Sequence, residues 1–596
     1  MGDAMDLPTS PCTAAGSKPS QASEQDISSW KDGRVDLPSA AKSHKYHVQP
    51  TKLVNRFIDE PREIRVAVIG AGLAGVSAGI LLPAKVPGIK LTIFDKNAEV
   101  GGTWFENIYP GVRCDVPAHV YQSTFDSNTQ WSEEFAQGPE ILNYWKTLAR
   151  KYEVYKLLKL AHKVESLDWD PQESAWLINV HDLTTDTSRI EKFDFVITAI
   201  GRFNNWKLPD YPGIRDYKGL IRHTSNWDPN FDVTGKKVAV IGNGASGIQL
   251  VANIQKRVER LDHYARNPTW IAQSFGGHDT SIEPKVIPQE LMDSFKDPET
   301  YLKYRKVMED SYFRGFNRWL KGSESNTEDR DHLTELARTR LAENPELFEK
   351  IIPEFSPHCR RLTPGPGYLE AISQPHVDYI QTPIKRFTDT GIETTDGKTR
   401  DVDAIFCATG ANIDAAPPFP IRSGMADLSL DWKHEGAYGF PYTYLGAASP
   451  GFPNLLFLHG PSGSGRAGTV PYNVENQVTY FAKILRKVSR EGIKTMAPSK
   501  RAADDFVAYT DAFFDTTVLS ENCSSCAMQM TIIQQNPRWE DWEYEYLSKG
   551  GNRFAWYFGN GRTRLEADPE VDVTAYLSAE KDVDLRGLHE NWWSVS

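Results

Sequence analysis

The sequence predicts an α/β fold that combines two Rossmann-like dinucleotide-binding domains, one inserted into the other, with a helical subdomain. Two glycine-rich loops, each placed between a β-branched strand and a helix of small residues, predict the two domains. Two similar apolar stretches, FDFVITAIG at 193–201 and VDAIFCATG at 402–410, bracket the second loop and predict the insertion. Residues 283–350 are rich in Lys, Glu, Leu and Tyr with few glycines, which favours helices.

The first glycine-rich loop lies in RVAVIGAGLAGVSAGILL, residues 65–82. Gly70, Gly72 and Gly75 form the pattern G-x-G-x-x-G, which permits a tight turn, close approach of a pyrophosphate and packing of the helix on the strand. The N-terminus of that helix favours the phosphate charge. The next strand ends at Asp95, twenty residues past Gly75, where a carboxylate accepts a hydrogen bond from a ribose hydroxyl. This loop is therefore predicted to bind a dinucleotide without a 2′-phosphate, either FAD or NAD.

The second loop repeats this device in KVAVIGNGASGIQL, residues 237–250. Here the second strand ends in Arg266, nineteen residues past the last glycine, and a guanidinium at that place suits a 2′-phosphate. NADP is therefore predicted, and NADPH held here would reduce a flavin held by the first loop. The alternative is a duplicated NAD(P) domain with one idle copy. The residues expected to contact this nucleotide are Gly242, Gly244, Ser246, Gly247, Arg266 and Asn267.

The domain boundaries follow from these patterns. A tail rich in Ser, Pro and Ala occupies residues 1–60, and it lacks the apolar core of a signal peptide. The first part of the FAD domain is expected at 61–201, and its second part at 410–596. Between them, the NADP domain is expected at 202–409, with the helical insert at 283–350.

Composition and charge exclude several classes of partner. The net charge of −12 and the isoelectric point near 5.7 argue against a protein that binds a nucleic-acid backbone. The apolar run from Val66 to Leu82 is too short for a membrane span and contains several glycines. Six scattered cysteines make no disulfide framework, and the pair Cys523 and Cys526 lacks the further ligands that a zinc site needs. These features favour a cytoplasmic protein without a bound metal.

Two longer motifs give a family resemblance. In YKGLIRHTSNWD, the pattern F-x-G-x-x-x-H-x-x-x-W-[PD] is matched, with Tyr in place of Phe, by Tyr217, Gly219, His223, Trp227 and Asp228. A second signature, G-G-x-W-x(4)-[FY]-P-G-x(3)-D, is met in full by Gly101, Gly102, Trp104, Tyr109, Pro110, Gly111 and Asp115. On these residues the chain resembles, from roughly 60 to 565, the class B flavoprotein monooxygenases and among them the Baeyer-Villiger monooxygenases. The stretch CRRLTPGPGYLEAI is similar to fungal members from secondary metabolism.

The resemblance implies an enzyme that uses NADPH, FAD and O2 to insert one oxygen next to the carbonyl of a small-molecule ketone, giving an ester or lactone. It implies that Arg361 is the catalytic cation, that Asp115 pairs with it, and that Arg360 joins Arg266 at the 2′-phosphate. His223, in the linker between the two domains, is implied to couple their movement, with direct acid–base catalysis as the minor alternative. The residues that line up with FAD contacts are Gly102, Thr103, Trp104, Tyr121 and Val164.

The chain departs from the family after SENC, residues 520–523. Residues 524–536 are shorter than in relatives and lack their tryptophan, and Ser462 stands where Asn is common. That region walls the substrate pocket in relatives, so either the pocket is unusually open or the segment is damaged. Two alternatives stay open: a related flavin monooxygenase that hydroxylates nitrogen or sulfur, and a catalytically impaired flavoprotein with a binding role.

Overall fold

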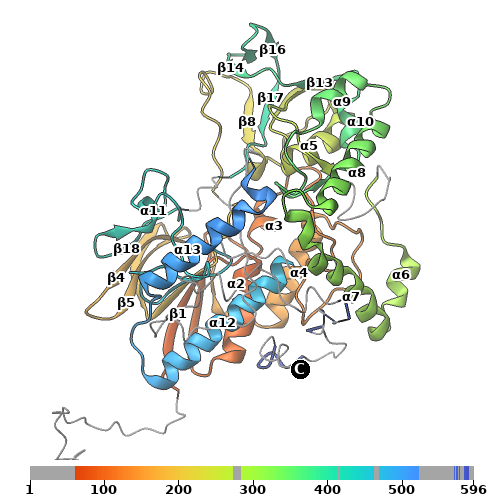
Figure 1. Ribbon diagram of the computed structural model, residues 1–596. Helices are drawn as coiled ribbons and strands as arrows, with labels where there is room; N and C mark the ends of the chain where they lie inside the picture. The colour runs from red at the N-terminus through yellow and green to blue at the C-terminus, as the bar shows by residue number, and fades with distance from the viewer. Residues whose placement is uncertain are drawn as a thin grey trace, which may run out of the picture. The chain divides into compact units, whose positions relative to one another are not determined.

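The computed structural model describes residues 61–203, 205–272, 283–411, 416–461 and 469–521, together with 569, 570, 572, 574, 576, 577 and 583–588. Several features of the sequence fall outside these residues, namely the tail at 1–60, Ser462, Cys523, Cys526 and the 524–536 segment. Figure 1 shows the chain with its helices and strands labelled in sequence order.

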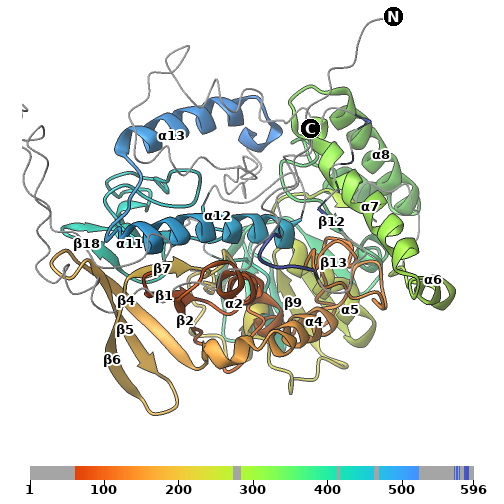
Figure 2. The same cartoon turned by 90° about the horizontal axis from the view of Figure 1, so that it is seen from below.

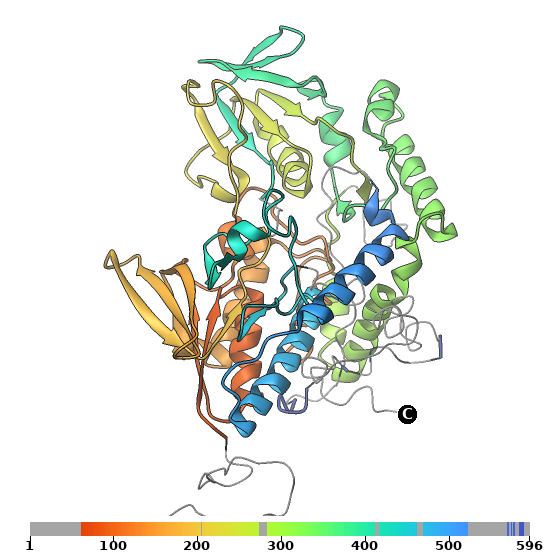
Figure 3. The ribbon, with the colours of Figure 1, turned by 60° about the vertical axis from the view of Figure 1, so that its left-hand side comes forward.

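The first of two similar sheets is parallel and has the strand order β20-β7-β1-β2-β3. Its strands are β1 (Ile64–Ile69), β2 (Ile89–Phe94), β3 (Leu158–Lys159), β7 (Phe195–Thr198) and β20 (Leu455–Phe457). Helix α2 (Leu73–Lys85) connects β1 to β2 and packs against α12 (Val470–Glu491), as Figures 2 and 3 show. Strand β1 is buried at all but one position, which explains its run of β-branched and small residues.

The second parallel sheet has the order β13-β10-β9-β17-β8 and lies in the upper part of Figure 1. Its strands are β8 (Leu220–His223), β9 (Lys237–Ile241), β10 (Arg260–Tyr264), β13 (Val377–Ile380) and β17 (Ala404–Cys407). Helix α5 (Ala245–Ile254) follows β9 as α2 follows β1, so the order β17-β9-β10 repeats the order β7-β1-β2. The predicted α/β fold class with two Rossmann-like units is confirmed.

The two bracketing strands occupy equivalent places in different sheets. The sequence predicts that the stretches 193–201 and 402–410 mark the crossings between the two domains. In the structure, β7 pairs with β1 in the first sheet, and β17 pairs with β9 in the second. Both strands are buried at every position beside a glycine loop, so their similar apolar character reflects the same environment in two units. The strand that returns to the first sheet from beyond the second is β20, which pairs with β7.

The remaining elements include a third sheet and further helices. The third sheet, of order β19-β18-β4-β5-β6, contains β4 (His162–Asp170), β5 (Ala175–Asp182), β6 (Thr187–Phe193), β18 (Ile421–Ser423) and β19 (Ala426–Asp427). Shorter strands are β11 (Ile271–Ala272), β12 (Thr363–Pro364), β14 (Ile384–Phe387), β15 (Gly391–Thr394) and β16 (Thr399–Asp401). The stretch predicted to be helical carries α6 (Gln289–Ser294), α7 (Pro298–Arg314), α8 (Glu324–Arg340) and α9 (Pro345–Ile351). Other helices are α3 (Thr103–Glu106), α4 (Gly138–Lys151), α10 (Tyr368–Ile372), α11 (Leu428–Asp431) and α13 (Lys500–Asp515).

Two expectations from composition can be compared with the described residues. Within them, no helix combines the length and the apolar character that crossing a bilayer requires. Cys114 and Cys407 are buried free thiols, whereas Cys359 is disulfide-bonded.

Candidate functional site

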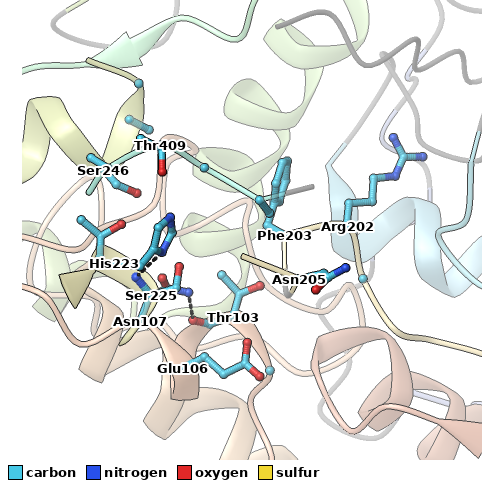
Figure 4. Close-up of a pocket in the computed structure, with 18 of the residues that line it drawn as sticks. Thr103, Glu106, Asn107, Arg202, Phe203, Asn205, His223, Ser225, Ser246 and Thr409 are labelled. Atoms are coloured by element: carbon cyan, nitrogen blue, oxygen red, sulfur yellow. Dashed lines mark hydrogen bonds between the residues drawn. The ribbon is translucent and has the colours of Figure 1, made fainter. Parts of the chain in front are cut away.

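The two glycine loops open onto one cavity of ≈ 1590 Å³. Figure 4 shows side chains on three sides of it. Thr103, Glu106 and Asn107 come from the segment around α3, and Arg202, Phe203 and Asn205 come from the segment after β7. The third side is formed by the second unit through His223, Ser225, Ser246 and Thr409. Among the described residues, no cluster of His, Cys, Asp and Glu could hold a metal ion.

The first glycine loop has no room for side chains where it packs. Gly70 has φ +110°, and a Cβ there would lie 2.4 Å from the oxygen of Ala199 at the end of β7. A Cβ on Gly75 would lie 1.9 Å from the oxygen of Gly70, so this glycine lets α2 pack against the loop. Gly72, the N-cap of α2, makes no side-chain capping bond, and the first amides of the helix are not capped by a side chain. Such amides suit a pyrophosphate.

The second glycine loop repeats this construction. A Cβ on Gly242 would lie 2.5 Å from the oxygen of Ala408, and one on Gly247 would lie 2.0 Å from the oxygen of Gly242. A Cβ on Gly244, the N-cap of α5, would meet open space, and α5 also lacks a side-chain cap. Gly75 and Gly247 serve helix packing and do not line the cavity, whereas the other four glycines of the two loops do. Each loop therefore presents bare backbone at a helix N-terminus to the cavity.

Asp95 lines the cavity and also braces the first loop. Its Oδ2 accepts a hydrogen bond from the amide of Ala71 at 2.6 Å, and its Oδ1 accepts one from the amide of Asn97 at 2.8 Å. Burial raises the pKa of Asp95, and these two hydrogen bonds oppose the increase. The carboxylate thus holds the loop in shape, and a carboxylate oxygen has further lone pairs to accept a ribose hydroxyl.

The cationic residues expected at a 2′-phosphate lie together. Arg266 and Arg360, which are far apart in sequence, both line the cavity. Burial and the nearby charge of Arg266 together lower the pKa of Arg360. The guanidinium of Arg360 lies 4.9 Å from the centre of the Phe355 ring, and Asn267 accepts a hydrogen bond from Asn243 through its main-chain oxygen at 2.7 Å. Two cations held close together provide a site for a doubly charged phosphate.

Asp115 and Arg361 form a bidentate ion pair. Nε of Arg361 lies 2.8 Å from Oδ2 of Asp115, and Nη2 donates to Oδ1 at 3.0 Å. The Arg361 side chain is 48% exposed and that of Asp115 is 24% exposed, so the guanidinium is accessible from the cavity that both residues line. The fork geometry fixes the plane and direction of the cation.

The other residues expected at FAD gather on the same side as the first loop. Gly102 has φ +51°, and a Cβ there would lie 2.9 Å from the Cα of Gly72, which brings the 101–102 turn against the loop. Trp104 and Tyr121 meet edge to face with ring centres 5.8 Å apart, and burial raises the pKa of Tyr121 well above its usual range. The expected residues that line the cavity here are Gly102, Thr103, Trp104, Tyr121 and Val164.

The position of His223 differs from the predicted linker. His223 is the last residue of β8 and pairs with Cys407 of β17, so it belongs to the edge of the second sheet. Its Nδ1 accepts a hydrogen bond from the amide of Ser225 at 3.1 Å, and its ring stacks on Trp206 at 5.1 Å. Burial lowers the pKa of His223, so the ring is neutral at pH 7. Strand β8 has only four residues with no clear alternation, which explains why the sequence pattern did not predict it.

The rest of this motif anchors the chain to the second sheet. The hydroxyl of Tyr217 donates a hydrogen bond to the oxygen of Val402 at 2.7 Å, which accounts for Tyr in place of Phe. A Cβ on Gly219 would lie 2.2 Å from that hydroxyl, so glycine is required there. Trp227 packs on the ring of Phe406 with centres 4.6 Å apart. The motif is therefore a structural edge of the second unit, with His223 facing the cavity.

Sequence reasoning missed a contact that joins the second signature to α5. The hydroxyl of Tyr109 donates to Oε1 of Gln249 at 2.8 Å, and Nε2 of Gln249 donates to the oxygen of Arg113 at 3.1 Å. A Cβ on Gly111 would lie 2.1 Å from Nδ2 of Asn253. Residues 109–113, which belong to the second signature, therefore dock on the helix of the second unit. The available signal was the buried Gln249 among the apolar residues of α5.

Similarity to known proteins agrees with this site. The sequence pattern described as "Flavin-binding monooxygenase-like" matches residues 63–283. The "FAD-binding monooxygenase tazF" of Aspergillus terreus is 31% identical over 548 residues, which cover 87% of this chain and 95% of that protein. A "Baeyer-Villiger monooxygenase" of Pseudomonas aeruginosa is 29% identical, over 77% of this chain and 84% of that protein. A solved structure of OTEMO in complex with FAD and NADP has a TM-score of 0.66 at 25% identity, over 77% of this chain and 92% of that one.

Proposed function

Since the chain belongs to the flavin-binding monooxygenases of the Baeyer-Villiger type, we propose that it inserts one oxygen atom of O2 next to the carbonyl of a ketone. The enzyme is an FAD- and NADPH-dependent oxidoreductase, and its product would be an ester or a lactone. The observation that carries the proposal is the ion pair of Asp115 and Arg361, because it aims a permanent cation into the cavity that both glycine loops reach.

The residues around the first loop fit FAD. The bare amides at the N-terminus of α2 would hold its pyrophosphate, and Asp95 would accept a hydrogen bond from its ribose. When bound, FAD supplies the activation of O2, with electrons that come from NADPH. The residues proposed to contact it are Gly70, Gly72, Asp95, Gly102, Thr103, Trp104, Asp115, Tyr121 and Val164, while Gly75 would act by letting α2 pack against the loop.

The residues around the second loop fit NADP. The amides at the N-terminus of α5 would hold the pyrophosphate, and the paired guanidiniums of Arg266 and Arg360 would bind the 2′-phosphate. This pair favours NADPH over NADH because only the former carries the third phosphate. The residues proposed to contact it are Gly242, Gly244, Ser246, Arg266, Asn267 and Arg360, while Gly247 would act by letting α5 pack against the loop.

Arg361 would stabilise the negative charge that develops on oxygen while the ketone reacts. Its guanidinium stays protonated throughout, so it can act on two successive anions without giving up a proton. At an effective dielectric of about 20, a charge about 4 Å away contributes roughly 4 kcal/mol. Asp115 would act through Arg361 by holding it in one direction, and it would not contact the ketone.

His223 would act as a positioning residue between the two units. One ring nitrogen is occupied by the Ser225 amide and the ring is stacked on Trp206, so the imidazole is fixed in orientation. Its lowered pKa keeps it neutral and makes it a poor proton donor at neutral pH. These features support coupling of the second sheet to the cofactors over proton exchange with the ketone.

A bulky ketone of secondary metabolism is the proposed substrate. The resemblance of residues 359–372 to fungal members supports it, as does similarity to the fungal protein from Aspergillus terreus. The alternative reaction, hydroxylation of nitrogen or sulfur, uses the same cofactors. The test is to incubate the FAD-loaded protein with NADPH, air and a panel of ketones, amines and sulfides, and to weigh the products. Ketone products heavier by one oxygen support the proposal, whereas N-oxides or sulfoxides without any ester would refute it.

A further inference from the structure

A further guanidinium, that of the partly buried Arg202, lines the cavity in addition to those discussed above. Arg202 follows Gly201, which has φ +70°, on the segment that leaves β7 for the second unit. Figure 4 shows it on the side of the cavity that also carries Phe203 and Asn205. Arg202 belongs neither to a glycine loop nor to either signature, so none of the roles proposed above explains it.

The described residues satisfy the guanidinium of Arg202 poorly. Its Nη2 donates a hydrogen bond to the main-chain oxygen of Gly460, and its Nε is buried without a hydrogen-bond partner. No carboxylate in the described part of the chain forms an ion pair with it. Burial lowers the pKa of Arg202 to about 10, so the group remains protonated at neutral pH. A buried charge is costly, and such groups are normally paired with a counter-charge.

The charged groups near His459 leave Arg202 uncompensated. Burial and the charges of Arg202 and Arg361 lower the pKa of His459 to about 3, which keeps this cavity-lining imidazole neutral. The Asp115 carboxylate is paired with Arg361 in a bidentate ion pair, so its charge balances Arg361 and not Arg202. Among these described groups, two positive charges therefore face one negative charge. The difference is one positive charge, which a ligand can balance.

The two cofactors have other groups for their phosphates. The N-termini of α2 and α5 would take the pyrophosphates, and Arg266 with Arg360 would take the 2′-phosphate. Phe203, next to Arg202, is 58% exposed and lines the cavity, so it offers an apolar surface beside the cation. An apolar surface next to a partly buried guanidinium fits a ligand with an apolar body and a carboxylate.

We propose that Arg202 is a specificity-determining residue and that the substrate is a ketone that carries a carboxylate on an aromatic or otherwise apolar body. The proposal rests on the proposed ketone oxygenation and names the substrate class for it. Arg202 would bind the carboxylate and Phe203 would cover the apolar body, while the carbonyl faces Arg361. An ion pair at one end of the substrate would fix which carbonyl reaches the reacting site.

The test uses the full-length, FAD-loaded protein and a matched pair of ketones, an oxocyclohexylbenzoate and its methyl ester. Binding is measured without turnover, as the change in flavin absorbance when each ketone is titrated into the oxidised enzyme with NADP+. We expect the carboxylate to bind at least about tenfold more tightly than the ester, because only the carboxylate makes charge-assisted hydrogen bonds to Arg202. The ratio of kcat/KM for the two ketones should show the same preference.

Two variants and a control separate recognition from folding. Arg202→Met removes the charge at similar length and should remove the preference for the carboxylate, whereas Arg202→Lys should keep part of it. Arg422→Met is the matched control, since Arg422 pairs with Asp168 outside the cavity lining, and it should leave the preference intact. FAD content is measured for each protein, so loss of cofactor is distinguished from loss of recognition.

The outcomes decide the proposal independently of the ketone chemistry. Equal binding of the two ketones by the unaltered protein would overturn the proposal. An Arg202→Met variant that keeps the preference for the carboxylate would also overturn it, and so would one that shows a lower preference only because it has lost FAD. If Arg202→Met does not fold, the preference of the unaltered protein still decides. If the unaltered protein prefers the carboxylate but oxygenates neither ketone, the recognition role stands and the proposed function fails.

Discussion

Removal of the Asp115–Arg361 ion pair should abolish ester formation without unfolding the protein. The pair joins atoms at 2.8 and 3.0 Å, but its side chains are 48% and 24% exposed. Ion pairs that solvent reaches contribute only about 0.2–1 kcal/mol to folding. The cation matters far more for the reaction, since roughly 4 kcal/mol at about 4 Å corresponds to about a thousandfold in rate.

The expected effects of the variants are not additive. Arg361→Ala should lower the rate of ester formation about a thousandfold. Asp115→Asn should lower it about tenfold to a hundredfold, because the cation remains but is no longer held in direction. The double variant should match Arg361→Ala, since Asp115 is proposed to act only through Arg361. The assay is ester yield by mass spectrometry, with flavin reduction by NADPH followed separately.

A matched control comes from another ion pair whose arginine is similarly exposed, with 54% of the Arg386 side chain accessible. Arg386→Ala removes the partner of Glu393, 2.6 Å away, and should change neither ester yield nor flavin reduction. An Arg361→Ala variant with normal ester yield would contradict the assignment. A double variant whose loss is the product of the two single losses would show that Asp115 acts independently of Arg361.

Three further outcomes are expected. Arg266→Gln should lower the preference for NADPH over NADH by about tenfold to a hundredfold, because a charge-assisted hydrogen bond contributes about 1.5–3 kcal/mol. The preference is measured as the ratio of kcat/KM for flavin reduction by the two nucleotides. An unchanged ratio would show that Arg266 does not bind the 2′-phosphate. Gly219→Ala should lower stability by about 1–3 kcal/mol in thermal unfolding, since its Cβ would lie 2.2 Å from the Tyr217 hydroxyl; unchanged stability would disprove the tight contact. Burial lowers the pKa of His263 to about 4, whereas the pKa of a histidine in the unfolded chain is about 6.5. The unfolded chain therefore binds the proton more readily, and the free energy of unfolding should fall by up to about 1.4 kcal/mol per pH unit between pH 6.5 and pH 4. His263→Gln should flatten that slope in denaturant unfolding at several pH values, and an equally steep slope would argue against His263 as its source.

Local chemistry explains what could be predicted. Each glycine loop, its preceding strand and the helix that follows are contiguous in sequence, so the pattern of residues specifies the turn and the phosphate site together. Asp95 and Arg266 each follow the second strand of their unit at a fixed spacing from the glycine loop, so they could be found from the sequence and their charge indicates which nucleotide binds. The fold class, the two units and the cofactor types therefore followed from short segments.

Other features could not be predicted from the sequence, because they depend on contacts between residues that are far apart in the chain. The partner strand of each glycine loop comes from a distant segment, and the likeness of β7 and β17 could not reveal that they belong to different sheets. The docking of Tyr109 on Gln249 joins residues 140 positions apart, and no local pattern encodes it. His223 was misplaced in a linker because a four-residue edge strand carries too little periodicity to be recognised.

The sequence by itself determined that the chain has two dinucleotide loops of different charge, because a loop and its helix N-terminus are built from adjacent residues. Only the tertiary structure decided that Asp115 and Arg361, 246 positions apart, form a bidentate ion pair, and that the Nε of Arg202 is buried without a hydrogen-bond partner among the described residues. Burial and charge balance depend on every segment that surrounds a side chain, and those segments meet only when the chain is folded.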